Sequence, residues 1–213
     1  MLPIAFENNN GNGRLNLFNG EYQYDFNVNQ QSGSSIQLDF TASVPASIFA
    51  AAGLYVLGLE IDLVDAASGE PVASTQLFDF QVLVEPKLQT NLAGTRSAGV
   101  DGVKLSVIDF GELKTGMSER IFIQIRGNAP AKITVSSENK GRLLMEKTTH
   151  DFIDYSVSVD GESSTLEAPL NLRRPVTQDL RGTSYPMDVK IGNVEGAFAG
   201  VYRDVISIEV QPQ

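Results

Sequence analysis

Apolar and polar residues alternate along most of this chain in short runs. A period of two places apolar side chains on one face of an extended strand and polar side chains on the other. The pattern therefore predicts half-buried β-strands, and no segment has a convincing helical stripe. The clearest alternating runs are Ile36–Phe40, Leu59–Leu63, Phe78–Val84, Val103–Val107, Ile121–Ile125, Ala131–Val135, Tyr155–Val159 and Met187–Ile191.

Turn signals separate these runs. Asn19-Gly20, Ser68-Gly69 and Asp160-Gly161 are dipeptides of the kind that tight hairpin turns prefer. Strands at such short intervals indicate antiparallel sheets packed as sandwiches. The predicted fold class is all-β, with two immunoglobulin-like antiparallel β-sandwich domains.

The alternating rhythm lapses around Gln89–Gly102, where the chain reads QTNLAGTRSAGVDG. Small, polar and glycine-rich composition is typical of a linker. The predicted organisation is an N-terminal β-sandwich over residues 1–88, a linker over residues 89–102 and a C-terminal domain over residues 103–213. Each piece has a reasonable size for a sandwich domain.

One segment occurs twice. AAGLYVLGLEIDL at Ala51–Leu63 resembles FAGVYRDVISIEV at Phe198–Val210, and the two Ala-Gly-x-Tyr motifs are 147 residues apart. The strands after these motifs keep the same parity, so that Leu59, Ile61 and Leu63 correspond to Ile206, Ile208 and Val210. Because a one-residue slip would reverse every face, preserved parity favours two related domains.

The two copies differ in the length of chain after them. The first copy precedes the predicted strand Phe78–Val84, whereas only Gln211-Pro-Gln213 come after the second. If the domains share a topology, the second lacks its last strand and exposes unpaired backbone groups beside its core. Two alternatives remain open: another chain supplies the strand, or a segment of this chain such as Leu2–Phe6 covers the edge. The residues predicted to line the resulting donor-strand groove are Val103, Leu105, Val107, Tyr202, Ile206, Ile208 and Val210.

Charge excludes one class of partner. The net charge is −10, and the residues up to Leu88 carry −8 of it. A surface that binds phosphates needs the opposite sign, so we expect no nucleic-acid partner.

No apolar run is long enough for a transmembrane helix, so we expect no membrane insertion. The start, MLPIAFENNN, has no signal-peptide pattern, and we expect any signal peptide to have been removed.

Catalytic chemistry has little support in the sequence. The chain has no cysteine, which excludes disulfides, thiol nucleophiles and zinc–thiolate sites. The one histidine, His150, lies in a polar stretch with no nucleophile motif nearby. Acidic residues such as Glu60 and Asp62 fall on the solvent faces of strands. We therefore expect no enzyme, no metal site and no cofactor.

The second half of the chain reads DFGELKTGMSERIFIQIRGNAPAKITVSSENKGRL at Asp109–Leu143 and continues through IDYSVSVDG and YPMDVKIGNV to AGVYRDVISIEV. These segments resemble the spore coat protein U family, which includes subunits of archaic-class chaperone–usher pili. Its final strand carries an Ala-Gly-x-Tyr-x-Asp signature, matched here by Ala199, Gly200, Tyr202 and Asp204. Many members carry a cysteine pair, which this chain lacks.

The resemblance implies incomplete immunoglobulin-like domains, a periplasmic chaperone that supplies the missing strand, an outer-membrane usher and a neighbouring pilus subunit. It also implies that a two-domain member can be a tip adhesin that contacts a host or abiotic surface, passing through the periplasm to the cell surface. The short N-terminal segment Leu2–Phe6 is a poor donor strand, which favours the tip. The alternative is a freestanding periplasmic or surface binding module whose domains are completed by residues 1–35.

A mostly apolar connection in the first domain, Val44–Gly53, is a candidate contact surface, because loops are usually polar. Its predicted contact residues are Pro45, Ile48, Phe49 and Leu54. The alternative is that the loop folds over the end of the sandwich and closes its core.

Overall fold

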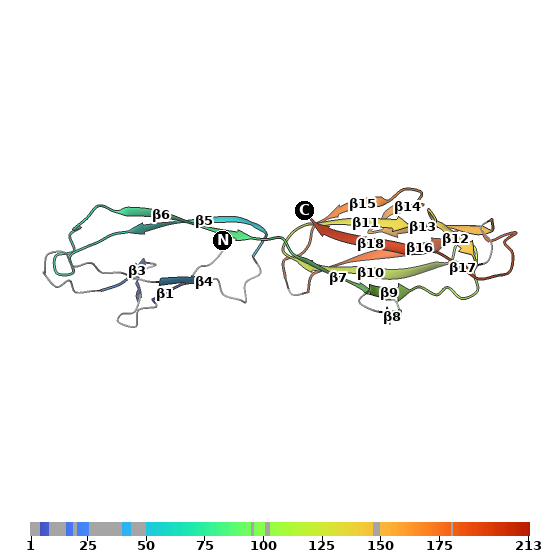
Figure 1. The fold of residues 1–213 in the computed structure, drawn as a ribbon, viewed down its shortest axis with the longest axis horizontal. Helices are drawn as coiled ribbons and strands as arrows, with labels where there is room; N and C mark the ends of the chain where they lie inside the picture. The colour runs from blue at the N-terminus through green and yellow to red at the C-terminus, as the bar shows by residue number, and fades with distance from the viewer. Residues whose placement is uncertain are drawn as a thin grey trace. The chain divides into compact units, whose positions relative to one another are not determined.

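The computed structural model describes residues 5–8, 16–18, 21–25, 40–43, 50–94, 96–100, 103–146, 150–179 and 181–213. The chain divides into two compact units, Met1–Val84 and Glu85–Gln213. All regular secondary structure in the described residues is β-strand, and every strand pairing is antiparallel (Figure 1). The predicted all-β fold of immunoglobulin-like sandwich type is confirmed.

The first unit contains three strand pairs in its described part. The longest is a hairpin of β5 (Gly53–Ile61) and β6 (Gln76–Val84), in which all nine residues of each strand are paired. Its tip is an Asx turn, in which the Asp65 carboxylate accepts hydrogen bonds from the backbone N–H of Ala67 and Ser68. The other pairs are β1 (Ala5–Asn8) with β4 (Phe40–Ser43), and β2 (Asn16–Phe18) with β3 (Glu21–Gln23).

The second unit is a sandwich of two main sheets. The larger sheet has the order β17-β12-β13-β16-β10-β7, with β14 also paired to β13, and the smaller has the order β15-β11-β18. A separate hairpin is formed by β8 (Arg96–Val100) and β9 (Val103–Val107). The strands of the larger sheet are β7 (Leu88–Ala93), β10 (Ser118–Gly127), β12 (Arg142–Met145), β13 (Phe152–Val159), β14 (Glu162–Ser164), β16 (Thr183–Ile191) and β17 (Tyr202–Arg203). Those of the smaller sheet are β11 (Ala131–Ser137), β15 (Leu170–Arg174) and β18 (Ile206–Pro212).

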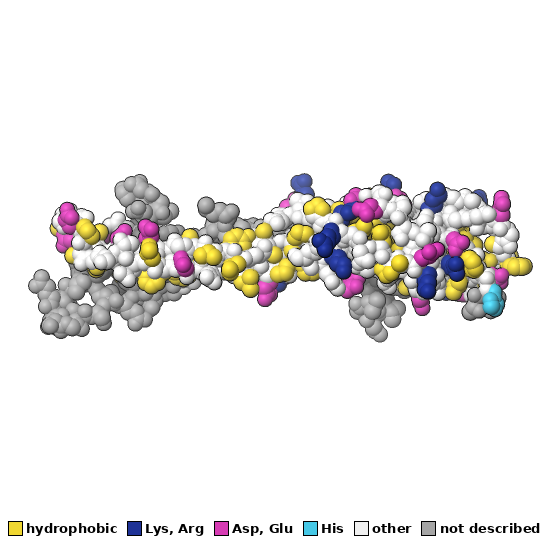
Figure 2. Space-filling model, turned by 90° about the horizontal axis from the view of Figure 1, so that it is seen from above, with side chains coloured by type: hydrophobic (Ala, Val, Ile, Leu, Met, Phe, Trp, Pro, Cys, Tyr) yellow, Lys and Arg dark blue, Asp and Glu magenta, His cyan; other side chains and the backbone are white. Residues whose placement is uncertain are grey.

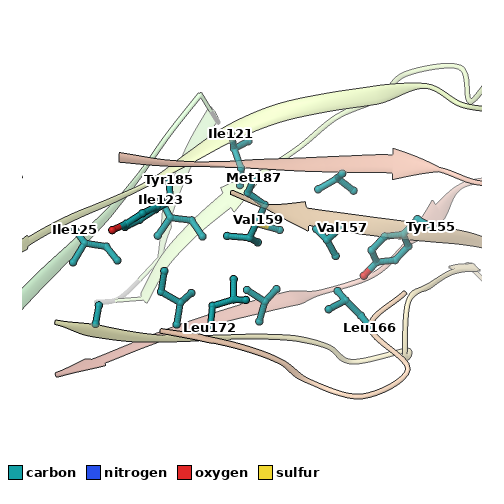
Figure 3. Packing of buried hydrophobic residues seen from close by; sticks show 14 of the residues in the cluster. Ile121, Ile123, Ile125, Tyr155, Val157, Val159, Leu166, Leu172, Tyr185 and Met187 are labelled. Carbon is teal, nitrogen blue, oxygen red and sulfur yellow. The ribbon is translucent and has the colours of Figure 1, made fainter. Parts of the chain in front are cut away.

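The core of the second unit lies between these two sheets. Alternate residues of β10, β13 and β16 point inward from the larger sheet and meet those of β11 and β15 (Figure 3). The alternation is strict in β10, where Ile121, Ile123 and Ile125 are buried and the residues between them are exposed. The period-two pattern in the sequence therefore indicates the inward face of each central strand.

The connection between the units differs from the linker predicted over residues 89–102. β7 begins at Leu88 and pairs with β10, so the first part of the predicted linker is a sheet strand. The segment between β6 and β7 is only Glu85-Pro86-Lys87. Asn128 holds this segment, because its side chain accepts a hydrogen bond from the Lys87 backbone N–H (2.7 Å) and donates one to the Glu85 carbonyl (3.0 Å).

Candidate functional site

The C-terminal segment of the chain passes from one sheet to the other. β17 pairs with β12 in the larger sheet, whereas β18 pairs with β11 in the smaller one. The crossing occurs at Asp204 and Val205, between the two strands. The segment that repeats Ala51–Leu63 is therefore split, and its second part lies at the edge of the smaller sheet.

The Asp204 carboxylate lies at the centre of a hydrogen-bond cluster at this crossing. One oxygen accepts from the Ser137 hydroxyl (2.6 Å) and from the Tyr155 hydroxyl (2.5 Å). The other accepts from the backbone N–H and the side-chain amide of Asn139 and from the N–H of Val205. Burial, together with the hydrogen bond to Asp204, raises the pKa of Tyr155 far above its usual range, so the phenol stays a donor to the carboxylate.

The inward face of β18 is incompletely buried. Ile206, Ile208 and Val210 pack against the core, yet all three are only half-buried. On the neighbouring strand β11, Ile133 is 0% exposed. An edge position alone does not explain this difference, because Leu172 on the opposite edge strand β15 is only 2% exposed.

The outer edge of β18 has no strand beside it among the described residues, since the smaller sheet ends there. The nearest strand across the opening is β7, which approaches β18 and forms the edge of the larger sheet. Leu88 and Leu92 of β7 are also half-buried and pack against the core. We call the edge of β18 with Ile206, Ile208 and Val210, facing β7, the open edge.

The predicted groove residues are only partly brought together here. Ile206, Ile208 and Val210 lie on the open edge, and Tyr202 lies just before it on β17. Val103, Leu105 and Val107 form β9, which pairs with β8 rather than with β18, and Val107 is 45% exposed. The strand that approaches β18 is β7 instead, and the alternation of Leu88, Thr90 and Leu92 was the available signal for it.

The described strands within residues 1–35 have their pairing partners in the first unit. β1 pairs with β4, and β2 pairs with β3, all within the first unit. Most of residues 1–35 lies outside the described residues, so the expectation that this stretch completes the second domain stays a prediction.

The predicted contact loop of the first unit is mostly outside the described residues, which do not include Pro45, Ile48 and Phe49. Leu54 is described and is 60% exposed. Its directly paired neighbour on β6, Leu83, is 68% exposed, and no pattern in the sequence had pointed to it. The two leucines form a small apolar area on the outward face of the β5–β6 hairpin.

The repeated tyrosines make the same contact in both units. The Tyr55 hydroxyl donates to the Ala51 carbonyl (2.9 Å), and the Tyr202 hydroxyl donates to the Phe198 carbonyl (2.8 Å). Each bond spans four residues back to the start of its motif. This is the geometry of the tyrosine corner found in immunoglobulin-like sandwiches, so the sequence repeat is also a repeat of local structure.

The described residues offer little for catalysis or metal binding. His150 is exposed on a bend, and no group of three or more His, Asp and Glu side chains there is placed to hold a metal ion. Charged side chains of both signs are spread over the second unit (Figure 2). None of the described segments is a helix that is long and apolar enough to cross a membrane.

No protein-family model matches this chain, and no curated protein matches it. Among solved structures, it is similar to the pre-assembly complex of a chaperone and a tip adhesion subunit from the archaic chaperone–usher Csu pili of Acinetobacter baumannii. That match has 16% sequence identity and a TM-score of 0.40, and covers 97% of this chain and 80% of the other. A chaperone–tip adhesin complex of CFA/I fimbriae biogenesis is also similar, with 16% identity and a TM-score of 0.41, covering 99% of this chain and 68% of the other.

Proposed function

We propose that this chain is a structural and adhesive subunit of a bacterial surface pilus, assembled by donor-strand complementation. The open edge is the observation that carries the proposal. It combines a strand edge that is unpaired among the described residues with three apolar side chains that are only partly removed from water.

A strand added to this edge would pair with the backbone of β18 and cover Ile206, Ile208 and Val210. Fully burying an aliphatic side chain stabilises by about 1.5–3 kcal/mol. Part of that remains available at each of the three positions, in addition to the backbone hydrogen bonds. An edge left in this state is also a hazard, because it can pair with any extended chain. A dedicated chaperone that occupies it is a physical solution to that hazard.

The partners in this proposal are a periplasmic chaperone, an outer-membrane usher and a neighbouring pilus subunit. The chain passes through the periplasm and ends at the cell surface. The first unit is the adhesive part at the pilus tip, where Leu54 and Leu83 offer exposed apolar contacts to a host or abiotic surface.

The test is to add a synthetic strand to the purified chain. The probe is a peptide with the sequence QLFDFQVLV, which the chain itself places beside its first motif as β6. The control peptide has the same composition with the alternation destroyed. We expect the probe to raise the melting temperature of the second unit in a concentration-dependent way.

The Ile208→Asp variant should abolish this shift, because it places a charge on the apolar face of the open edge. Glu209→Gln is its matched control on the outward face of the same strand and should keep the shift. An unchanged melting temperature at saturating probe would contradict the proposal.

A further inference from the structure

The backbone paths of the two copies of the repeated motif separate at one position. In the first unit, Leu57 continues β5 without a break and pairs with Phe80 of β6. The corresponding residue of the second unit is Asp204, 147 positions later, and there the strand ends. The chain leaves the larger sheet at Arg203 and joins the smaller one at Ile206.

The hydrogen bonds of Asp204 explain why the chain turns there. Ser137 is the last residue of β11 in the smaller sheet, and Tyr155 lies on β13 in the larger sheet. Asn139 is in the turn after β11. One carboxylate therefore accepts hydrogen bonds from both layers of the sandwich and from the turn between β11 and β12.

The same cluster anchors the first pair of the β11–β18 ladder. Ser137 pairs with Ile206, two residues after Asp204, and the backbone N–H of Glu138 donates to the Val205 carbonyl (3.0 Å). Beyond this point the chain belongs to a different sheet. A strand that runs along β18 therefore has no further edge to pair with past Asp204.

We propose that Asp204 is a positioning residue that commits the C-terminal strand to the smaller sheet and marks the end of the open edge. It limits an incoming strand to the stretch beside Ile206–Pro212, with contacts at three alternate apolar positions. A leucine at this place, as in the first unit, gives a continuous strand that pairs along all nine residues. The part of this inference that concerns an incoming strand rests on the proposed function.

The experiment compares Asp204→Asn and Tyr155→Phe with Glu209→Gln in the full chain, by hydrogen exchange of backbone amides. Asp204→Asn keeps the shape of the side chain but removes its charge, and Tyr155→Phe removes one donor from the cluster. Both should raise exchange at least tenfold in β18 and at the end of β11, while β10 and β16 stay protected. Glu209→Gln should change neither region.

The second measurement is the dissociation constant of the QLFDFQVLV probe for each variant. We expect Asp204→Asn to weaken binding about tenfold relative to Glu209→Gln, because the edge is no longer held in place. A probe truncated to the five residues FDFQV should bind the natural chain nearly as well as the full probe, since only three apolar contacts are offered.

The two measurements separate this inference from the proposed function. If exchange in β18 is unchanged in Asp204→Asn, or rises equally throughout the second unit, the positioning role of Asp204 is overturned. If exchange rises locally but the natural chain does not bind the probe, the proposed function fails while Asp204 still commits the strand to its sheet. If the five-residue probe FDFQV binds much more weakly than the full probe, the inference that Asp204 limits the length of the incoming strand is overturned.

Discussion

The two Ala-Gly-x-Tyr segments begin alike and end differently. Each starts with a tyrosine that hydrogen-bonds back to a carbonyl four residues earlier. In the first unit the next strand runs unbroken and pairs with β6 along its whole length, whereas in the second unit the strand is broken at Asp204 and its second part pairs with β11 of the other sheet. A short sequence motif thus determines its own local geometry but not which strands will lie beside it.

The repeated glycine shows the same contrast on a smaller scale. Gly53 has a φ of +151°, which disfavours any side chain. Its counterpart Gly200 lies close to Met145, and a Cβ there would approach the Met145 Cε to 2.5 Å. The backbone conformation favours glycine at the first position, whereas at the second a side chain requires only that the flexible end of Met145 move.

The largest loss of stability is expected at a fully buried position of the core, and a smaller loss is expected at the open edge. Ile133→Ala, in the fully buried face of β11, should lower the free energy of unfolding by about 2–5 kcal/mol. Ile208→Ala on β18 should cost less than about half as much, because its side chain is already partly in water. Urea unfolding monitored by far-UV circular dichroism measures both. Equal costs would mean that the isolated chain fills this edge by itself.

The second prediction concerns the hydrogen-bond cluster around Asp204, where the C-terminal strand passes from one sheet to the other. Tyr155→Phe should cost about 1.5–3 kcal/mol, as is usual for a hydrogen bond to a charged group. The pKa of Tyr155 is raised in the folded state, so its contribution is fully present below about pH 10 and is lost as the pH rises further.

Unfolding measured from about pH 8 to about pH 11, on either side of the ordinary tyrosine pKa, should therefore show a steeper alkaline loss in the natural chain than in Tyr155→Phe. Tyr55→Phe removes a tyrosine from the first unit and serves as the control. An unchanged alkaline slope in Tyr155→Phe would contradict the predicted link between this phenol and stability.

The third prediction tests whether the two tyrosine corners are equivalent. Tyr55→Phe and Tyr202→Phe each remove one neutral hydrogen bond, so each should cost about 1 kcal/mol in its own unit. Amide exchange resolves the two units separately. If only one of the two units loses stability, the two tyrosine corners share their geometry but not their contribution to the free energy of unfolding.

The weakest change is expected at the tip of the β5–β6 hairpin. The backbone N–H of Ser68, together with its hydroxyl, lowers the pKa of the Asp65 carboxyl. Its contribution to the turn is therefore present above the ordinary pKa of aspartate and is lost as the pH falls through the lowered value. The amide chemical shift of Ser68 should track this titration by NMR, and Asp65→Ala should remove it without altering the second unit.

The strands of the second unit were largely predictable from the sequence. Val103–Val107 is a strand with the predicted bounds, and the runs at Ile121–Ile125 and Tyr155–Val159 lie inside longer strands. The predicted linker differs from the structure, because the small and polar residues at Gln89–Ala93 have a composition typical of a connection. These residues form an edge strand, where only Leu88 and Leu92 need to be apolar.

Only one wall of the candidate site, the one formed by β18, could be predicted from the sequence. Ile206, Ile208 and Val210 could be assigned from the parity of the repeat, since side-chain direction is a property of adjacent residues. The sequence prediction places Val103–Val107, which form β9, at the opposite wall, whereas the strand beside the opening is β7. Alternation tells which face of a strand is buried, but it does not distinguish one amphipathic strand from another as a neighbour.

The features that the sequence alone determines are local: the all-β fold, the positions and faces of most strands in the second unit, and the repeat of the tyrosine motif. These depend on the alternation of neighbouring side chains and on turn-forming dipeptides. Only tertiary packing makes the C-terminal strand cross between sheets at Asp204 and remain open on one edge. That outcome depends on groups far apart in the chain, such as Tyr155 and Asp204, 49 residues apart. Their hydrogen bonds exist only after the two sheets have packed and excluded water.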